Sequence, residues 1–250
     1  MLSIEPLKHD DLTATASLHM ANLNMGLFPK LGRRFLSLYQ EGFARSPYGI
    51  ALVARDDDEV IGALFGTTSN ADHYNWVTHH QGIELALAGS GALVTNPQLA
   101  FDFARTRAVR YAKGLARHLG VSTPSVIAPR NGGGPLSVLS HIVTAGAARR
   151  RGVGRRLVDE FKSRASARGA HRAILVTQEG GLGTPFFERL GCRLVAKRQG
   201  QDGMTVREYR MILDEAGAYE DLENNRGRSI VVHAYPPRLG TPRPVPAQRR

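Results

Sequence analysis

The feature that most constrains the fold is a strand-like run, a turn of arginines and glycines, and a helix-like repeat, which follow one another between Val138 and Gly169. The run Val138–Thr144 is rich in β-branched residues and predicts a strand. A helix is expected from about Gly152 to Arg168, with Gly169 as its stop. Its apolar residues recur at helical spacing at Val153, Leu157, Phe161 and Ala165. The unit therefore predicts strand, turn and helix in sequence.

The turn Arg149-Arg150-Arg151-Gly152-Val153-Gly154 has the composition of an anion-binding loop. The first turn of a helix has backbone N–H groups without partners, and the helix dipole adds partial positive charge there. Glycine lets a phosphate approach the backbone closely. Arg155 and Arg156 follow directly and add attraction. The sequence therefore predicts an anion site at the start of this helix.

Two common phosphate motifs do not fit the turn. A P-loop requires Lys-Ser or Lys-Thr after its last glycine, and a dinucleotide fingerprint requires a third glycine where this chain has Leu157. The pattern Arg/Gln-x-x-Gly-x-Gly/Ala is matched by Arg149-x-x-Gly152-x-Gly154. With this motif after a strand and at the start of an amphipathic helix, the chain resembles the GNAT superfamily of N-acetyltransferases.

A second segment carries the same resemblance. Phe186-Phe187-Glu188-Arg189-Leu190-Gly191-Cys192 is similar to the Phe-Tyr-Glu-Lys-Leu-Gly-Phe segment that follows the fifth strand of the family. Together the resemblance covers about residues 2–70 and 136–213. It implies an α/β fold with a GNAT-like mixed, mostly antiparallel central sheet, flanked by helices and with a helical insertion between the third and fourth strands.

The local patterns agree with that order of elements. Further strands are expected at Leu2–Leu7, Ile50–Ala54, Val60–Thr67, Arg172–Thr177, Cys192–Lys197 and Val206–Leu213. Further helices are expected from Asp10 or Asp11 to Gly26, from Leu31 to Arg45 and from Thr184 to Leu190.

The insertion, about residues 69–120, is expected to be helical. Asn96 before Pro97 indicates a helix start, because asparagine caps a helix and proline suits its first position. Tyr74, Trp76 and Ile83 are interpreted first as packing residues and second as the wall of an acceptor pocket. In such proteins, inserted helices shape an acceptor site or a dimer contact. A homodimer is therefore one of the expected alternatives.

The distribution of charge separates a domain from a tail. The formal net charge is +11, and six arginines lie between Arg226 and Arg250 among several prolines. We expect a single GNAT-like domain over residues 1–223 and a disordered, basic tail over residues 224–250. The basic balance favours an anionic partner, namely nucleic acid, acidic lipid or a phosphorylated cofactor.

Composition excludes several classes of protein. Hydrophobic residues make up 42% and charged residues 22%, which is ordinary globular composition. With Cys192 as the only cysteine, an intrachain disulfide and a cysteine-rich zinc module are excluded, and no metal is expected. The apolar stretch Ile83–Val94 contains Glu84 and is too short to span a bilayer. The start of the chain lacks a secretory signal, so no membrane partner and a cytoplasmic location are expected.

The resemblance also assigns cofactor-binding residues. It implies acetyl-CoA, or another acyl-CoA, as the co-substrate, and backbone groups of Ile142, Val143 and Thr144 would hold its pantetheine arm and polarise the thioester carbonyl. The residues expected around the pyrophosphate are Arg149, Arg150, Arg151, Gly152, Val153, Gly154 and Arg155. Phe187 stands where the family has a tyrosine that acts as general acid, and it has no ionisable group. Another residue or water would protonate the thiolate, or the thiolate would depart unaided.

The amine of the acceptor must lose a proton before it attacks. His141, in the fourth strand, and Glu179, just past the fifth, are the candidate bases. The alternative for His141 is a packed, hydrogen-bonded histidine without a catalytic role.

The leading hypothesis is an N-acyltransferase that moves an acetyl or other short acyl group from acyl-CoA to a primary amine of a small molecule, such as an amino sugar or a secondary metabolite. The first alternative is a protein acetyltransferase that acts on lysine or an N-terminus. The alternative of another class is a catalytically weak CoA-binding protein or a nucleic-acid-binding regulator. The arginine cluster has no interleaved aromatic residues, which argues against nucleic acid.

Overall fold

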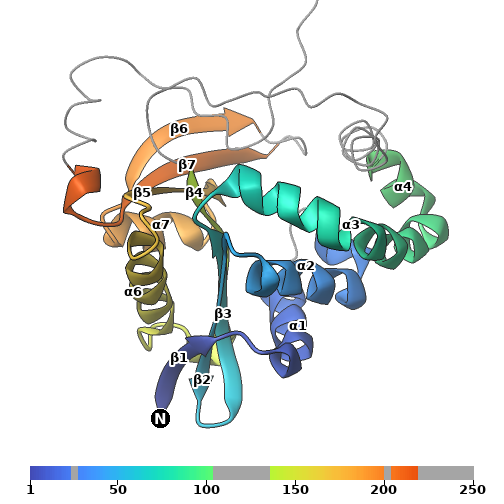
Figure 1. Cartoon of the computed structure of the whole chain (residues 1–250), viewed down its shortest axis with the longest axis horizontal. Helices are drawn as coiled ribbons and strands as arrows, with labels where there is room; N and C mark the ends of the chain where they lie inside the picture. The colour runs from blue at the N-terminus through green and yellow to red at the C-terminus, as the bar shows by residue number, and fades with distance from the viewer. Residues whose placement is uncertain (24–27, 104–135, 200–203, 219–250) are drawn as a thin grey trace, which may run out of the picture.

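The computed structural model describes residues 1–23, 28–103, 136–199 and 204–218. These residues form a seven-stranded sheet in the order β1-β2-β3-β4-β5-β7-β6 with helices on both faces (Figure 1). The strands are β1 (Leu2–Pro6), β2 (Gly49–Asp56), β3 (Glu59–Thr67), β4 (Ser137–Thr144), β5 (Arg172–Gln178), β6 (Arg193–Gln199) and β7 (Thr205–Ile212). The α-helices are α1 (Leu12–Asn22), α2 (Arg33–Arg45), α3 (Asn70–Thr95), α4 (Pro97–Phe103), α6 (Val153–Ser166) and α7 (Gly183–Arg189). Short 3-10 helices cover His9–Asp11, Phe28–Leu31 and Gly146–Ala148.

The mixed, mostly antiparallel sheet expected from the sequence is confirmed. The neighbouring pairs in the sheet are antiparallel except for β4 and β5, which run parallel. The hairpin between β2 and β3 turns at Asp57, whose φ of 54° places it in the left-handed region that aspartate tolerates better than most residues. Each predicted strand is present, with ends that differ by one or two residues.

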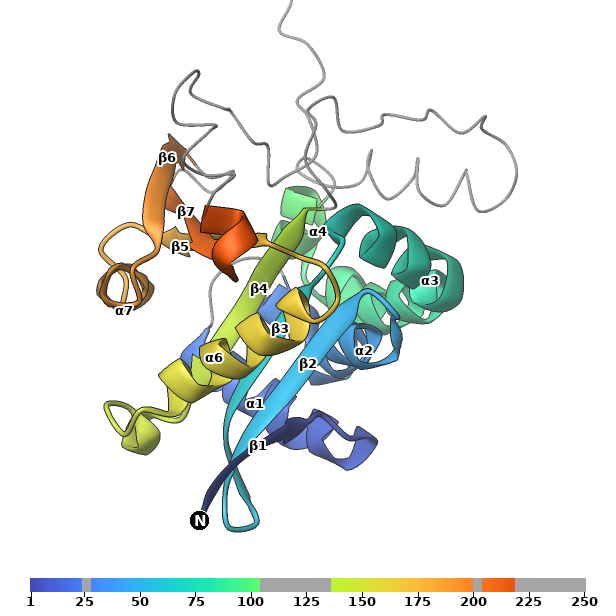
Figure 2. The ribbon, with the colours of Figure 1, turned by 60° about the vertical axis from the view of Figure 1, so that its left-hand side comes forward.

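The sheet lies between α6 on one face and α1 and α2 on the other (Figure 2). It separates two apolar cores. On one face, α6 and α7 pack through residues such as Leu157, Phe161 and Phe187, and we call this the α6 face. On the other face, α1, α2 and part of α3 pack through residues such as Leu36 and Phe65, and we call it the α2 face. Cys192 is buried in the first core, as a small residue, and burial raises the pKa of its thiol to about 11.

The parallel pair β4–β5 is short, and this shapes the site. The two strands pair only through Ser137–Ala173, Val138–Ile174 and Leu139–Leu175. Directly after Leu139 the pairing of β4 with β3 shifts by one residue, so Ser140 is the extra residue of a β-bulge. Beyond this point β4 continues along β3 and β5 continues along β7. The two strands therefore diverge and form a V that opens toward their C-terminal ends.

The insertion between β3 and β4 begins with two helices. The predicted start at Asn96 is confirmed, because the Asn96 side chain accepts a hydrogen bond of 3.0 Å from the Leu99 N–H. Residues 104–120 of the expected helical region, and the expected tail at 224–250, lie outside the described residues. Ile83 is 58% exposed, so its interpretation as a packing residue is wrong. Tyr74 is 42% exposed, but its ring packs edge-on against His73, at 5.5 Å between centroids. Among the described residues, no helix has the length and apolar character needed to cross a membrane.

Candidate functional site

The loop before α6 has the backbone geometry of an anion-binding helix start. Gly152 is the N-cap of α6 with φ of 81°, a left-handed conformation that favours glycine. Its carbonyl accepts the first helical hydrogen bond, from the Arg156 N–H at 3.0 Å. The helix has no side-chain cap. The N–H groups of Val153, Gly154 and Arg155 precede the first helical donor and are therefore available to an external acceptor.

Several arginines of the loop are tied to neighbouring elements. Arg149 donates to the side chain of Asn22, at the end of α1, at 2.9 Å. Arg151 pairs with Asp56, at the end of β2, at 2.6 Å, and it lowers the pKa of that carboxyl. Arg150 has φ of 63° and is exposed, as are Arg149 and Arg151. The loop is therefore fixed to the sheet and to α1, while its cationic side chains remain in contact with solvent.

Gly154 faces α7 across the open end of the V. A β-carbon at Gly154 would lie 3.2 Å from the ring of Phe186 and 4.0 Å from Cδ1 of Ile142. The second glycine of the motif therefore brings the start of α6 close to both α7 and β4. Phe186 is half-buried here, whereas Phe187 is only 4% exposed and packs in the core of the α6 face near Tyr209. The sequence pointed to Phe187; the structure adds its neighbour Phe186 at the mouth of the V.

The ladder between β3 and β4 decides which backbone groups of β4 face the V. The N–H of Ala145 donates to Ile61 on β3 at 2.8 Å. Backbone groups alternate between the two sides of a strand, so the N–H of Val143, which pairs with Ala63, also points to β3. The N–H groups of Ile142 and Thr144 point the opposite way, into the V. The three residues named from the sequence thus divide into two that face the V and one that holds the sheet.

His141 lies on the α2 face beside α1 and α2. Its Nε2 is 3.1 Å from the hydroxyl of Tyr39, which is 3.5 Å from that of Tyr74 on α3. The ring of His19, on α1, is 5.0 Å from the His141 ring between centroids. Burial, with a smaller effect of His19, lowers the pKa of His141 to about 3. The imidazole is therefore neutral at pH 7 and is a weak proton acceptor.

Glu179 lies on the other face of the sheet. Its carboxylate accepts hydrogen bonds from Arg207 at 2.8 Å and pairs with Lys197 at 2.8 Å. These two cations lower its pKa. Arg207 also contacts Glu188 of α7, so this network holds α7 to β6 and β7. The structure therefore does not bring the two predicted bases, His141 and Glu179, together.

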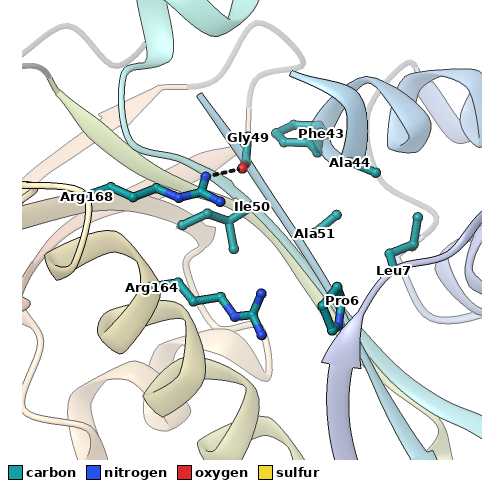
Figure 3. A pocket seen from close by; sticks show the side chains of 9 residues that line it. All are labelled: Pro6, Leu7, Phe43, Ala44, Gly49, Ile50, Ala51, Arg164 and Arg168. Carbon is teal, nitrogen blue, oxygen red and sulfur yellow. Dashed lines mark hydrogen bonds between the residues drawn. The ribbon is translucent and has the colours of Figure 1, made fainter. Parts of the chain in front are cut away.

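A small pocket of about 90 Å³ lies at the C-terminal end of α6, whereas the anion-binding loop is at its N-terminal end. Figure 3 shows the residues that line this pocket. It lies beside the end of β1 and the start of β2, where Arg168 donates to the Gly49 carbonyl at 2.8 Å. Arg164, which also lines it, pairs with Glu160 at 2.7 Å. Both guanidinium groups are engaged, and the pocket is at the C-terminal end of α6, so it is separate from the candidate site.

Known proteins share both the motif-bearing segment and the fold. The sequence model of the acetyltransferase (GNAT) domain matches residues 123–213. No curated protein matches the sequence.

Three solved structures are similar at a TM-score of 0.50. They are the ribosomal-protein-S18-alanine N-acetyltransferase from Escherichia coli (11% identity, 86% of this chain and 95% of that one), Ard1 from Thermoplasma volcanium (12%, 86% and 99%) and the aminoglycoside 6'-acetyltransferase type Ii (14%, 85% and 97%). At these identities the likeness concerns the fold, and it extends over nearly the whole of each solved chain. With the V between β4 and β5 and the glycine-led start of α6, this chain therefore has the GNAT fold, and its residues 123–213 match the sequence model of the GNAT acetyltransferase domain.

Proposed function

We propose that the protein is an N-acyltransferase that moves an acetyl or other short acyl group from acyl-CoA to a primary amine. The observation that carries the proposal is the start of α6, where the N–H groups of Val153, Gly154 and Arg155 precede the first helical donor beside the open end of the V. The exposed arginines of the loop add attraction for a pyrophosphate.

The residues around the V fit an acyl-CoA. The N–H groups of Val153, Gly154 and Arg155 suit the pyrophosphate, and those of Ile142 and Thr144 suit the amides of the pantetheine arm and the thioester carbonyl. Phe186 and Ile142 supply apolar contacts at the mouth of the V. The cofactor supplies the thioester to be attacked. The protein residues hold it so that its carbonyl meets the acceptor on the α2 face.

The acceptor we propose is a small-molecule amine, such as an amino sugar or an amine of secondary metabolism. In support, α3 packs against α2, and the hydroxyl of Tyr74 on α3 approaches Tyr39 and thereby His141. The added helix α3 narrows the access of an acceptor to the α2 face. This suits a small molecule better than a folded protein. Protein N-acetylation is the alternative, and the similar structures include enzymes of both kinds by their names.

The experiment is a binding measurement followed by a panel of acceptors. Acetyl-CoA and CoA should raise the melting temperature by mass action, and an oligonucleotide should not. Release of free thiol from acetyl-CoA is then followed with glucosamine, ethylamine and a peptide that has a free N-terminus and a lysine. No stabilisation at millimolar CoA contradicts the proposal, and stabilisation by the oligonucleotide alone favours a nucleic-acid-binding protein.

A further inference from the structure

Glu208 lies in the middle of β7 on the α2 face of the sheet. Side chains alternate along a strand, and its neighbour Tyr209 belongs to the core of the α6 face. In the sheet, Glu208 pairs with Val176 of β5 on one side and with Ala196 of β6 on the other. Its side chain therefore projects from the face on which His141 lies, opposite to Glu179.

The position of Glu208 along the sheet is set by the point where the V opens. Leu175 is the last residue of β5 that pairs with β4, and Val176 is the next. Paired residues on adjacent strands have β-carbons about 5 Å apart. Glu208 is thus one strand away from the vertex of the V, within reach of a group bound there directly or through one water molecule.

The carboxylate of Glu208 is incompletely partnered. Its side chain is only 2% exposed, and its Oε2 pairs with Arg198 at 3.0 Å. Within the described part of the chain, Oε1 is buried and has no hydrogen-bond partner. Buried carboxylate oxygens require a donor. An ammonium group or a water molecule that carries its proton would supply one.

Glu208 is also better suited to accept a proton than the two bases expected from the sequence. Burial raises the pKa of Glu208, against the opposing effects of Arg198 and Arg210. By contrast, burial weakens His141 as a base, and Glu179 is held ionised by Lys197 and Arg207 on the far face. A carboxylate with a raised pKa retains more of the basicity that the reaction requires.

We infer that Glu208 is the general base that accepts a proton from the acceptor ammonium at the vertex of the V. This inference rests on the proposed function. One proton passes from the ammonium to Oε1, directly or through water, and the nitrogen lone pair forms the bond to the thioester carbon. The carbonyl electrons move to oxygen and then return as the carbon–sulfur bond breaks, with its electron pair leaving on sulfur. A second proton passes from nitrogen to the thiolate through water, and Glu208 returns its proton to solvent.

The test uses two acceptors of nearly equal shape, ethylamine and O-methylhydroxylamine, with acetyl-CoA and the full chain. Ethylamine is protonated at pH 7 and must lose a proton first, whereas O-methylhydroxylamine is neutral. The variant Glu208→Gln should lower kcat/KM for ethylamine by about 10²-fold and leave that for O-methylhydroxylamine within about tenfold of the unmodified chain. An equal loss with both acceptors, or no loss with either, overturns the inference.

A control and a second measurement complete the design. Glu160→Gln makes the same chemical change on α6, where Glu160 pairs with Arg164, and should leave both rates unchanged. The carboxyl ¹³C signal of Glu208, read in the complex with CoA, should shift when ethylammonium is added; a signal that does not respond overturns the inference even where turnover is slow. Binding of CoA is measured on the same samples, so a failure of the proposed function is recognised separately.

Discussion

The ring of Phe186 lies against Gly154, only 3.2 Å from the place a β-carbon would occupy there. This contact joins the start of α6, which follows β4, to α7, which follows β5, so it connects the two sides of the V. It makes Gly154 sensitive to substitution for two reasons, the approach of phosphate to the backbone and the position of the aromatic ring.

Gly154→Glu should abolish measurable binding of CoA while the chain remains folded. The carboxylate would occupy the position of the phosphate and repel it, and Phe186 would have to move by a few tenths of an ångström. We expect at least a hundredfold loss of affinity, or about 2.7 kcal/mol, by calorimetry. Gly146→Glu is the control, because it adds the same charge near the loop where a β-carbon meets nothing within 4 Å. Equal affinities in Gly154→Glu and the unmodified chain would show that the loop only starts a helix.

Gly152→Ala should lower the free energy of unfolding by about 1 kcal/mol, because alanine is strained at φ of 81°. A β-carbon at Gly152 meets nothing within 4 Å, so the backbone alone accounts for the effect. Gly91→Ala is the matched comparison within α3, where the added β-carbon is equally unobstructed. There the same substitution should stabilise by about 0.5–1 kcal/mol, because alanine favours a helix. Urea unfolding of both variants measures the difference, and two effects of the same sign contradict the argument.

The sequence predicts the elements of this fold well where local chemistry decides them. The start of α6 is fixed by Gly152, and the start of α4 by Asn96 and Pro97. The side of a short helix that faces the core is decided by packing instead. Phe186 and Phe187 are adjacent and equally apolar, yet one is half-buried near Gly154 and the other is in the core.

Ion pairs between residues of different strands also cannot be predicted from local sequence patterns. Glu179 follows β5 directly and so resembled a catalytic residue, but its partners come from β6 and β7. Glu208 was missed because it lies in an ordinary alternating strand. Strand alternation shows that Glu208 and Tyr209 lie on opposite faces of the sheet. Whether the face of Glu208 borders the site depends on where β4 and β5 separate, and the structure shows this point at the pair Leu139–Leu175.

Phe187→Tyr should destabilise the protein and leave the affinity for CoA unchanged. Phe187 is 4% exposed within the core of the α6 face, so an added hydroxyl would be buried without a designed partner. The expected cost is about 1–3 kcal/mol in the free energy of unfolding. Phe186→Tyr places the same hydroxyl on the half-buried ring at the mouth of the V and should cost less. A Phe187→Tyr variant with undiminished stability and faster turnover would instead place this ring at the thioester sulfur.

The buried histidine of α3, His73, should make stability depend on pH. Burial lowers the pKa of His73 from 6.5 to about 4, and both of its ring nitrogens lack hydrogen-bond partners within the described residues. The unfolded chain takes up a proton below pH 6.5, whereas the folded chain does so only near pH 4. Stability from a neutral His73 is therefore complete above pH 6.5 and is lost as the pH falls toward 4.

His73→Leu should reduce this dependence, because leucine cannot be protonated and fills the position against Phe43, on which the imidazole now stacks at 4.4 Å. Between pH 7 and pH 5, one such histidine contributes about 2 kcal/mol to the change in the free energy of unfolding. The variant should lose that part of the change and keep the parts contributed by His19 and His141, whose pKa values burial lowers to about 4 and about 3. Asn75→Leu adds leucine on the exposed side of the same helix without removing a titratable group, and should leave the pH dependence as it is. Urea unfolding at the two pH values measures it, and equal pH dependence in His73→Leu and the unmodified chain would mean that α3 does not keep this imidazole from protonation.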